Sequence, residues 1–155
     1  MTTLKSGLIG EFEEEIAATR KMLEAVPQDR WEWRPHEKSM TLGRLASHVA
    51  MMPAAAAAIL RKRGPGPSES ESKKELLENF EANVAACREQ LEALTEERLA
   101  GKMFVTPAIE KPVFALLQGR GFLNHMIHHR GQLSVYLRIC GVAVPGVYGP
   151  SADEK

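Results

Sequence analysis

The chain has 155 residues and carries 20 acidic and 20 basic side chains, so its formal net charge at neutral pH is zero. This balance argues against a general nucleic-acid-binding protein or one held on anionic membranes, because both classes normally carry a basic excess. The length suits one domain with its own hydrophobic core, covering residues 1–155.

The N-terminal segment contains acidic residues from Glu11 onward and has no long apolar core, so we expect no signal peptide. No stretch reaches the roughly 18 consecutive uncharged apolar residues that a membrane span needs, and we expect no membrane association. Cys87 and Cys140 lack the Cys-x-x-Cys spacing, which favours a reduced, cytoplasmic protein over a disulfide-bonded one. Cys87 is expected to be a small core residue.

The first predicted element is a helix over residues 4–26. Its inward positions recur at steps of three and four residues, the spacing of one helical face: Leu4, Leu8, Phe12, Ile16, Thr19, Leu23 and Val26. Pro27 ends the helix, because proline cannot continue a helix interior. Residues 27–38 then form a long connection, and we expect Trp31 and Trp33 to pack over one end of the helices.

The second predicted helix begins near Ser39 or Thr41, which are both good N-cap residues, and runs to about Arg63. His48 lies on its apolar face, so it should point toward the other helices. Pro53 removes a backbone hydrogen bond and is expected to kink this helix. The Gly- and Pro-containing residues 64–70 form a loop.

A third helix is predicted over residues 72–99, opened by a capping box between Ser72 and Glu75. Residues 100–112 form a second connection, with a short extended piece at 103–105. A fourth helix then runs from about Pro112 to Cys140, where Gly141 suits the position after the helix end.

The predicted fold is therefore all-α. It is a four-helix bundle with a long loop between the first two helices and an extended C-terminal tail.

Residues 124–132, with the sequence Asn-His-Met-Ile-His-His-Arg-Gly-Gln, hold three of the five histidines within the fourth predicted helix. His125 and His129 are four residues apart and project from one face, so both imidazoles can bind one metal ion. His48 on the second helix could complete a site with three nitrogen ligands. His128 lies on the flank and could replace His129, whereas His36 falls in the loop and should be exposed.

Three polar side chains share the predicted face of His125 in a continuous fourth helix. At about 100° per residue, Gln118, Gln132 and Tyr136 all lie within about 20° of His125. Inward polar groups are costly unless something satisfies them, and a metal or a bound ligand would do so. These three residues are therefore predicted to line the site or to support its ligands, whereas Arg130 points away and should be a structural or interface residue.

The ligand type indicates the metal and its chemistry. Imidazole suits zinc, nickel, copper or iron better than magnesium or calcium, and three protein ligands leave one coordination position open for water or a thiol. Met126 follows His125, so the His-Glu-x-x-His motif of metalloproteases is absent. A general base would have to come from elsewhere, with Glu15 and Glu110 as candidates. Cys140 lies about 16 Å along the helix from His129, too far to be a ligand.

Four segments together resemble the DinB-like superfamily of DNA-damage-inducible and YfiT-type bundle proteins. They are Trp33-Arg34-Pro35, residues 39–48, residues 125–132 and the tail at 144–154. The resemblance implies a four-helix bundle that holds a divalent metal through His48, His125 and His129, and it implies a homodimer. Some relatives are S-transferases or isomerases that use a low-molecular-weight thiol such as bacillithiol or mycothiol.

Three functions remain open at this point. The first is a zinc- or nickel-dependent S-transferase or hydrolase that activates a thiol or water against a small-molecule substrate, with no nucleic-acid or membrane partner. The second is a non-catalytic module or stress-response protein that binds a metal or small molecule. In the third, the histidines are only hydrogen-bonded core residues of a structural dimer.

Overall fold

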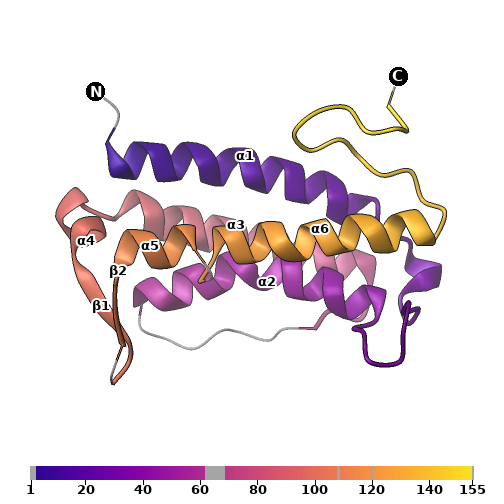
Figure 1. Ribbon diagram of the computed structural model, residues 1–155, viewed down its shortest axis with the longest axis horizontal. Helices are drawn as coiled ribbons and strands as arrows, with labels where there is room; N and C mark the ends of the chain where they lie inside the picture. Colours follow the sequence, from indigo (N-terminus) through magenta and orange to yellow (C-terminus); the bar gives the residue numbers. More distant parts are fainter. Residues whose placement is uncertain (1–2, 62–68, 108, 120, 155) are drawn as a thin grey trace.

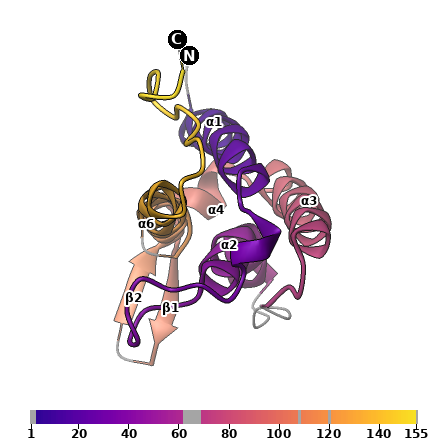
Figure 2. The same ribbon diagram turned by 90° about the vertical axis from the view of Figure 1, so that its right-hand side faces the viewer.

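The computed structural model describes residues 3–61, 69–107, 109–119 and 121–154. Within these residues, four long helices form a bundle (Figure 1): α1 (Leu4–Glu24), α2 (Leu42–Arg61), α3 (Lys73–Glu92) and α6 (Leu123–Ile139). Both α1 and α2 pack mainly against α3 and α6, so α1 and α2 occupy opposite corners of the bundle (Figure 2). The predicted helical bundle is confirmed.

The connection between α1 and α2 is long because it must cross one end of the bundle diagonally. It contains a short 3₁₀ helix, η1 (Gln28–Arg30). Trp31 is buried there, and the ring of Trp33 meets the ring of Tyr136 on α6 edge to face, with 5.7 Å between centroids. The prediction that both tryptophans pack over the end of the helices is confirmed.

Carbonyl groups of this connection cap the start of α2. The N–H groups of Leu42 and Gly43 donate to the carbonyls of Trp33 and Trp31, at 2.8 and 2.9 Å. The Thr41 hydroxyl accepts from the Arg44 N–H at 3.2 Å, which confirms the predicted N-cap. The tryptophan segment thus sets where α2 begins.

Gly43 gives a first prediction, because Trp31 lies directly against it. A Cβ at Gly43 would lie 2.3 Å from atoms of the Trp31 indole ring. Alanine normally stabilises a helix by roughly 0.5–1 kcal/mol relative to glycine. At this position we expect Gly43→Ala instead to destabilise the fold by about 1–3 kcal/mol, the usual cost of overpacking. The measurement is the free energy of unfolding in urea.

Gly10 on α1 is the matched control for this substitution. It is exposed, and a Cβ there would meet nothing within 4 Å. Gly10→Ala should therefore raise the free energy of unfolding by about 0.5–1 kcal/mol. The same positive effect at Gly43 would contradict the close Trp31 contact.

The third predicted helix is divided in two. α3 ends at Glu92, and a separate short helix, α4 (Glu96–Ala100), follows. The Thr95 hydroxyl caps α4 by accepting from the Arg98 N–H at 3.1 Å. At the start of α3, Ser72 accepts from the Glu75 N–H, but the Glu75 carboxylate bonds the N–H of Glu71 instead. The predicted capping box is thus only half formed.

The fourth predicted helix is also divided, which corrects the continuous helix expected over residues 112–140. Its parts are α5 (Val113–Gln118) and α6. Gly119 and Gly121 lie between them, and a Cβ on either would come within 2.6 Å of a backbone carbonyl oxygen. Only glycine permits so close an approach of two backbone segments. α6 therefore begins anew at Leu123, with a phase independent of α5.

A β-hairpin precedes α5. β1 (Lys102–Thr106) pairs antiparallel with β2 (Ile109–Pro112), so the predicted extended piece at 103–105 is confirmed as part of a longer strand. Phe104 and Ile109 are exposed on it, and Glu110 forms an ion pair with Lys102 at 3.7 Å.

The C-terminal tail folds back over α1 and α6 (Figure 1), where Tyr148 hydrogen-bonds to a buried ion pair between these two helices. The Arg130 guanidinium on α6 lies 2.6 Å from the Glu15 carboxylate on α1 and donates to the Thr19 hydroxyl at 3.1 Å. The Tyr148 hydroxyl from the tail accepts from Arg130 and donates to Glu15, both at 2.8 Å. Arg130 is thus structural, as predicted, whereas the candidacy of Glu15 as a general base is wrong.

Most of the predicted 64–70 loop and the predicted end of the second helix at Arg63 lie outside the described residues. Pro53 lies inside α2, which continues past it. Cys87 is fully buried, as predicted, and burial raises the pKa of its thiol to about 12.

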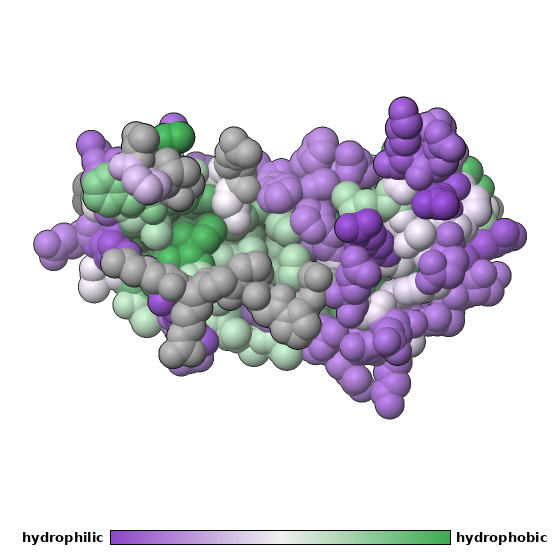
Figure 3. All heavy atoms as spheres, turned by 90° about the horizontal axis from the view of Figure 1, so that it is seen from below, coloured by the Kyte–Doolittle hydropathy of each residue, from purple (hydrophilic) through white to green (hydrophobic). Residues whose placement is uncertain are grey.

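α2 is the most apolar of the long helices. By length and composition alone it could cross a membrane, but 61% of the relevant window is buried inside the bundle. The core helix of a soluble protein passes the same test, so this match says little about membranes. Figure 3 shows the face on the α2 side, where hydrophilic residues cover most of the half near the α1–α2 connection. The expected lack of membrane association stays a prediction.

Candidate metal centre

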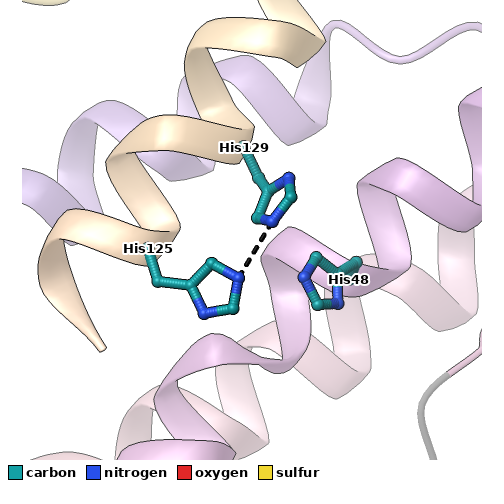
Figure 4. A group of neighbouring side chains, drawn as sticks. All are labelled: His48, His125 and His129. Carbon is teal, nitrogen blue, oxygen red and sulfur yellow. Dashed lines mark hydrogen bonds between the residues drawn. The ribbon is translucent and has the colours of Figure 1, made fainter. Parts of the chain in front are cut away.

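Three histidines from two helices converge between α2 and α6 (Figure 4). One potential ligand nitrogen from each of His48, His125 and His129 lies within 4.8 Å of the other two. The Nε2 atoms of His125 and His129 are 2.9 Å apart. The centroid of the His48 ring lies 5.3 Å from that of His125 and 4.4 Å from that of His129. The structure thus brings together the three residues that the sequence singled out.

Local geometry and helix packing each account for part of this arrangement. His125 and His129 share one face of α6 because they are one helical turn apart. His48 faces them because α2 packs against α6. All three histidines are half-buried.

The residues fit a divalent transition metal. Two imidazole nitrogens bound to one tetrahedral zinc at about 2.0–2.1 Å from the metal are themselves about 3.3 Å apart. The spacing of 2.9 Å between His125 and His129 is close to this value. Neutral imidazole is a ligand that zinc, nickel, copper and iron accept and that magnesium and calcium disfavour.

Gln132 holds one of the imidazoles in position. Its Oε1 lies 2.7 Å from Nδ1 of His129. In this arrangement the amide oxygen accepts, and the Nδ1–H tautomer of His129 that satisfies it would present the Nε2 lone pair toward the cluster. Histidines that bind metals usually have such a partner on the second ring nitrogen.

The other two predicted pocket residues lie elsewhere. The amide of Gln118 on α5 donates to the Glu11 carboxylate on α1 at 3.5 Å, so its predicted place on the histidine face is wrong. The reason is the break before α6, which removes the common helical phase. Tyr136 does lie on α6, but its ring packs against Trp33.

The alternative ligands are also placed. His128 is exposed, and although its ring lies 4.9 Å from that of His129, it does not belong to the three-nitrogen cluster. His36 is exposed in the α1–α2 connection, as predicted. Cys140 caps the C-terminal end of α6 and is not part of the cluster.

Burial favours the neutral form of His48 and His129. Burial, followed by the neighbouring charges of His129, His125 and Arg44, lowers the pKa of His48 from 6.5 to about 4. Burial also lowers the pKa of His129, in spite of the hydrogen bond to Gln132. Neutral rings at physiological pH are the form that binds a metal.

These shifts predict a pH-dependent stability for the metal-free protein. A histidine whose pKa is lower in the folded state than in the unfolded chain contributes stability that is fully present above the unfolded pKa of about 6.5. That contribution disappears as the pH falls toward about 4, the folded value for His48. In the presence of a chelator, we expect the melting temperature to decrease as the pH is lowered from about 6.5 to about 4.

His48→Ala should make this decline shallower, and His36→Ala, which removes an exposed histidine, should leave it unchanged. Thermal unfolding followed by circular dichroism across the pH range measures both. Equal declines in the His48→Ala variant and the unmodified protein would contradict the lowered pKa.

An open pocket of about 280 Å³ adjoins the cluster, lined by Met40, Arg44, His48, Met51 and Glu69. A second pocket of about 440 Å³ shares Arg44 and Glu69 with it. Sequence reasoning missed both charged residues. Arg44 could have been found, because it lies four residues before His48 and therefore on the same face of one helix. Glu69 reaches the pocket only through the tertiary fold.

Comparisons with known proteins agree with this architecture. The uncharacterized protein YjoA of Bacillus subtilis is 27% identical over 142 residues, which cover 86% of this chain and 89% of YjoA. The crystal structure of a DinB-like protein from Bacillus cereus superposes with a TM-score of 0.77 at 25% identity, covering 92% of this chain and 96% of that one. The crystal structure of YjoA gives a TM-score of 0.73 at 22% identity, covering 96% and 99%, and it supports the fold alone. The model of the DinB family matches residues 1–155. The chain therefore belongs to the DinB family.

Proposed function

We propose that this protein is a divalent-metal-dependent enzyme of the S-transferase or hydrolase type. His48, His125 and His129 would hold zinc or nickel. The observation that carries the proposal is the convergence of three imidazole nitrogens at the edge of an open pocket. Three protein ligands leave a coordination position free, as in catalytic rather than structural sites.

A bound ion at this site would act as a Lewis acid that lowers the pKa of a thiol or a water molecule. The chain supplies the remaining functions. Gln132 fixes the ring orientation of His129, and Met40 and Met51 provide an apolar wall beside His48. Glu15 is buried in its ion pair with Arg130 and cannot take the proton of the thiol or water, which would leave through the open pocket beside His48.

Metal content and activity test this proposal together. Elemental analysis of the protein purified without chelators should find about one zinc or nickel per chain. The metal-loaded protein should then accelerate the reaction of 2-mercaptoethanol with 1-chloro-2,4-dinitrobenzene, or the hydrolysis of 4-nitrophenyl acetate, and a chelator should abolish the acceleration. Failure to bind either metal after reconstitution would refute the metalloenzyme proposal.

A non-catalytic metal- or ligand-binding role is the second candidate. Gln132, which hydrogen-bonds to His129, favours this role. Its amide group cannot act as a general acid or base in a reaction at the metal. Stoichiometric metal binding without turnover of either class of substrate would select this function.

The proposal extends to location and partners. We infer a cytoplasmic homodimer that acts on a small molecule, with a low-molecular-weight thiol as cosubstrate and no nucleic-acid or membrane partner. Zero net charge supports the last point. Exposed Val135 and Ile139, one turn apart on α6, offer an apolar contact for a second copy. Sedimentation equilibrium measures the oligomeric state.

A further inference from the structure

The pocket beside the histidine cluster contains a cation placed by the same helix as His48. Arg44 and His48 lie one turn apart on α2, and both line the 280 Å³ pocket. A ligand atom directed at the histidine cluster would therefore leave the rest of a small molecule within the pocket that Arg44 also lines.

The present partner of Arg44 is held weakly. Its Nε lies 3.1 Å from Oε1 of Glu69, and both side chains are 63% exposed. An exposed ion pair contributes little to stability, because water competes for both charges. The Glu69 carboxylate can therefore be replaced by a carboxylate from a ligand at small cost to the fold.

Building on the proposed function, we propose that Arg44 is a specificity-determining residue that binds the carboxylate of a small thiol whose sulfur is directed at the histidine cluster. Glu69 occupies the guanidinium when the ligand is absent. The two pockets share Arg44 and Glu69, so the carboxylate would lie where the pockets meet.

The composition of the pocket favours a carboxylate over other anions. Among the described residues that line it, Arg44 is the one permanently charged cation, and Met40 and Met51 are apolar. One guanidinium matches a monoanionic carboxylate through two parallel hydrogen bonds. A phosphate dianion would keep a charge uncompensated beside Glu69. The volume of about 280 Å³ lies just below the usual range for ligand sites, about 300–1,000 Å³, which suits a small molecule.

Thiol binding to the cobalt-loaded protein tests this inference. The thiolate-to-cobalt absorption band reports binding of two matched probes, 3-mercaptopropionate with a carboxylate and 2-mercaptoethanol without one. We expect the ratio of their affinities to fall about tenfold in Arg44→Gln, the effect of one lost charge-assisted interaction. Glu69→Gln should raise the affinity for 3-mercaptopropionate and leave that for 2-mercaptoethanol unchanged.

Arg61→Gln is the matched control. Arg61 lies on the same helix and also forms an exposed ion pair, with Glu89 at 3.5 Å. This variant should keep the affinity ratio of the unmodified protein. An unchanged ratio in Arg44→Gln would overturn the inference, even if both thiols bind the metal.

A second readout separates failure of the inference from failure of the proposed function. Absence of the absorption band with both thiols would refute thiol binding at the metal. The Arg44 Nε–H signal, followed by NMR in the metal-free protein, then decides the inference. It should shift on addition of 3-mercaptopropionate but not of 2-mercaptoethanol, and no shift would overturn the role of Arg44.

Discussion

Replacing Arg130 by methionine is expected to lower the free energy of unfolding by about 3–5 kcal/mol, because it leaves a buried carboxylate without its cation. The side chains of Arg130 and Glu15 are 3% and 8% exposed, and they lie 2.6 Å apart. The substitution also removes the hydrogen bonds from Arg130 to Thr19 and Tyr148. Urea unfolding monitored by circular dichroism measures the loss.

The double variant Arg130→Met with Glu15→Gln is the control for this prediction. Removing both charges should recover much of the lost stability, since the cost arises from the unpaired charge. Arg130 points toward α1 and away from the histidine cluster, so metal affinity should survive in any folded variant. A loss below about 1 kcal/mol in Arg130→Met would mean that the pair is worth no more than a surface ion pair.

Alanine at His48, His125 or His129 is expected to reduce the affinity for zinc or nickel by more than about 100-fold, since removal of even an outer partner of a ligand costs about 10–100-fold. At a free metal concentration of 100 times the dissociation constant, the unmodified protein should gain about 2.7 kcal/mol of stability. Each variant should lose this gain at the same metal concentration. Metal titration and thermal unfolding measure the two effects.

His128→Ala is the matched control, because His128 is an exposed neighbour on the same helix and lies outside the cluster. It should bind metal as the unmodified protein does. If the three cluster variants were destabilised without metal and showed no change in metal affinity, the histidines would be core residues only.

The helices themselves could be predicted closely. The apolar spacing and Pro27 placed the first helix at 4–26, against the observed Leu4–Glu24. Of the two predicted N-caps of the second helix, Ser39 and Thr41, the structure selects Thr41. These features are local, because helical periodicity and caps depend on residues within a few positions of one another.

The breaks between α3 and α4 and between α5 and α6 were missed because the prediction relied on this local periodicity. Apolar residues continue at helical spacing on both sides of each break, so periodicity alone indicates one helix. Gly119 and Gly121 were the available signal for the second break, and Thr95 followed by Glu96 was the signal for the first. The placement of Gln118 failed because it assumed one helical phase across the glycines.

The sequence by itself determined the helical content, the chemistry of the ligands and the pairing of His125 with His129, which follows from one turn of helix. Only the tertiary structure decided that His48 joins this pair, that Glu69 meets Arg44, and that Glu15 is buried against Arg130. Glu15 and Arg130 are 115 residues apart in the chain. Such contacts depend on which helices pack together, and that choice reflects the burial of whole helical faces rather than any local pattern.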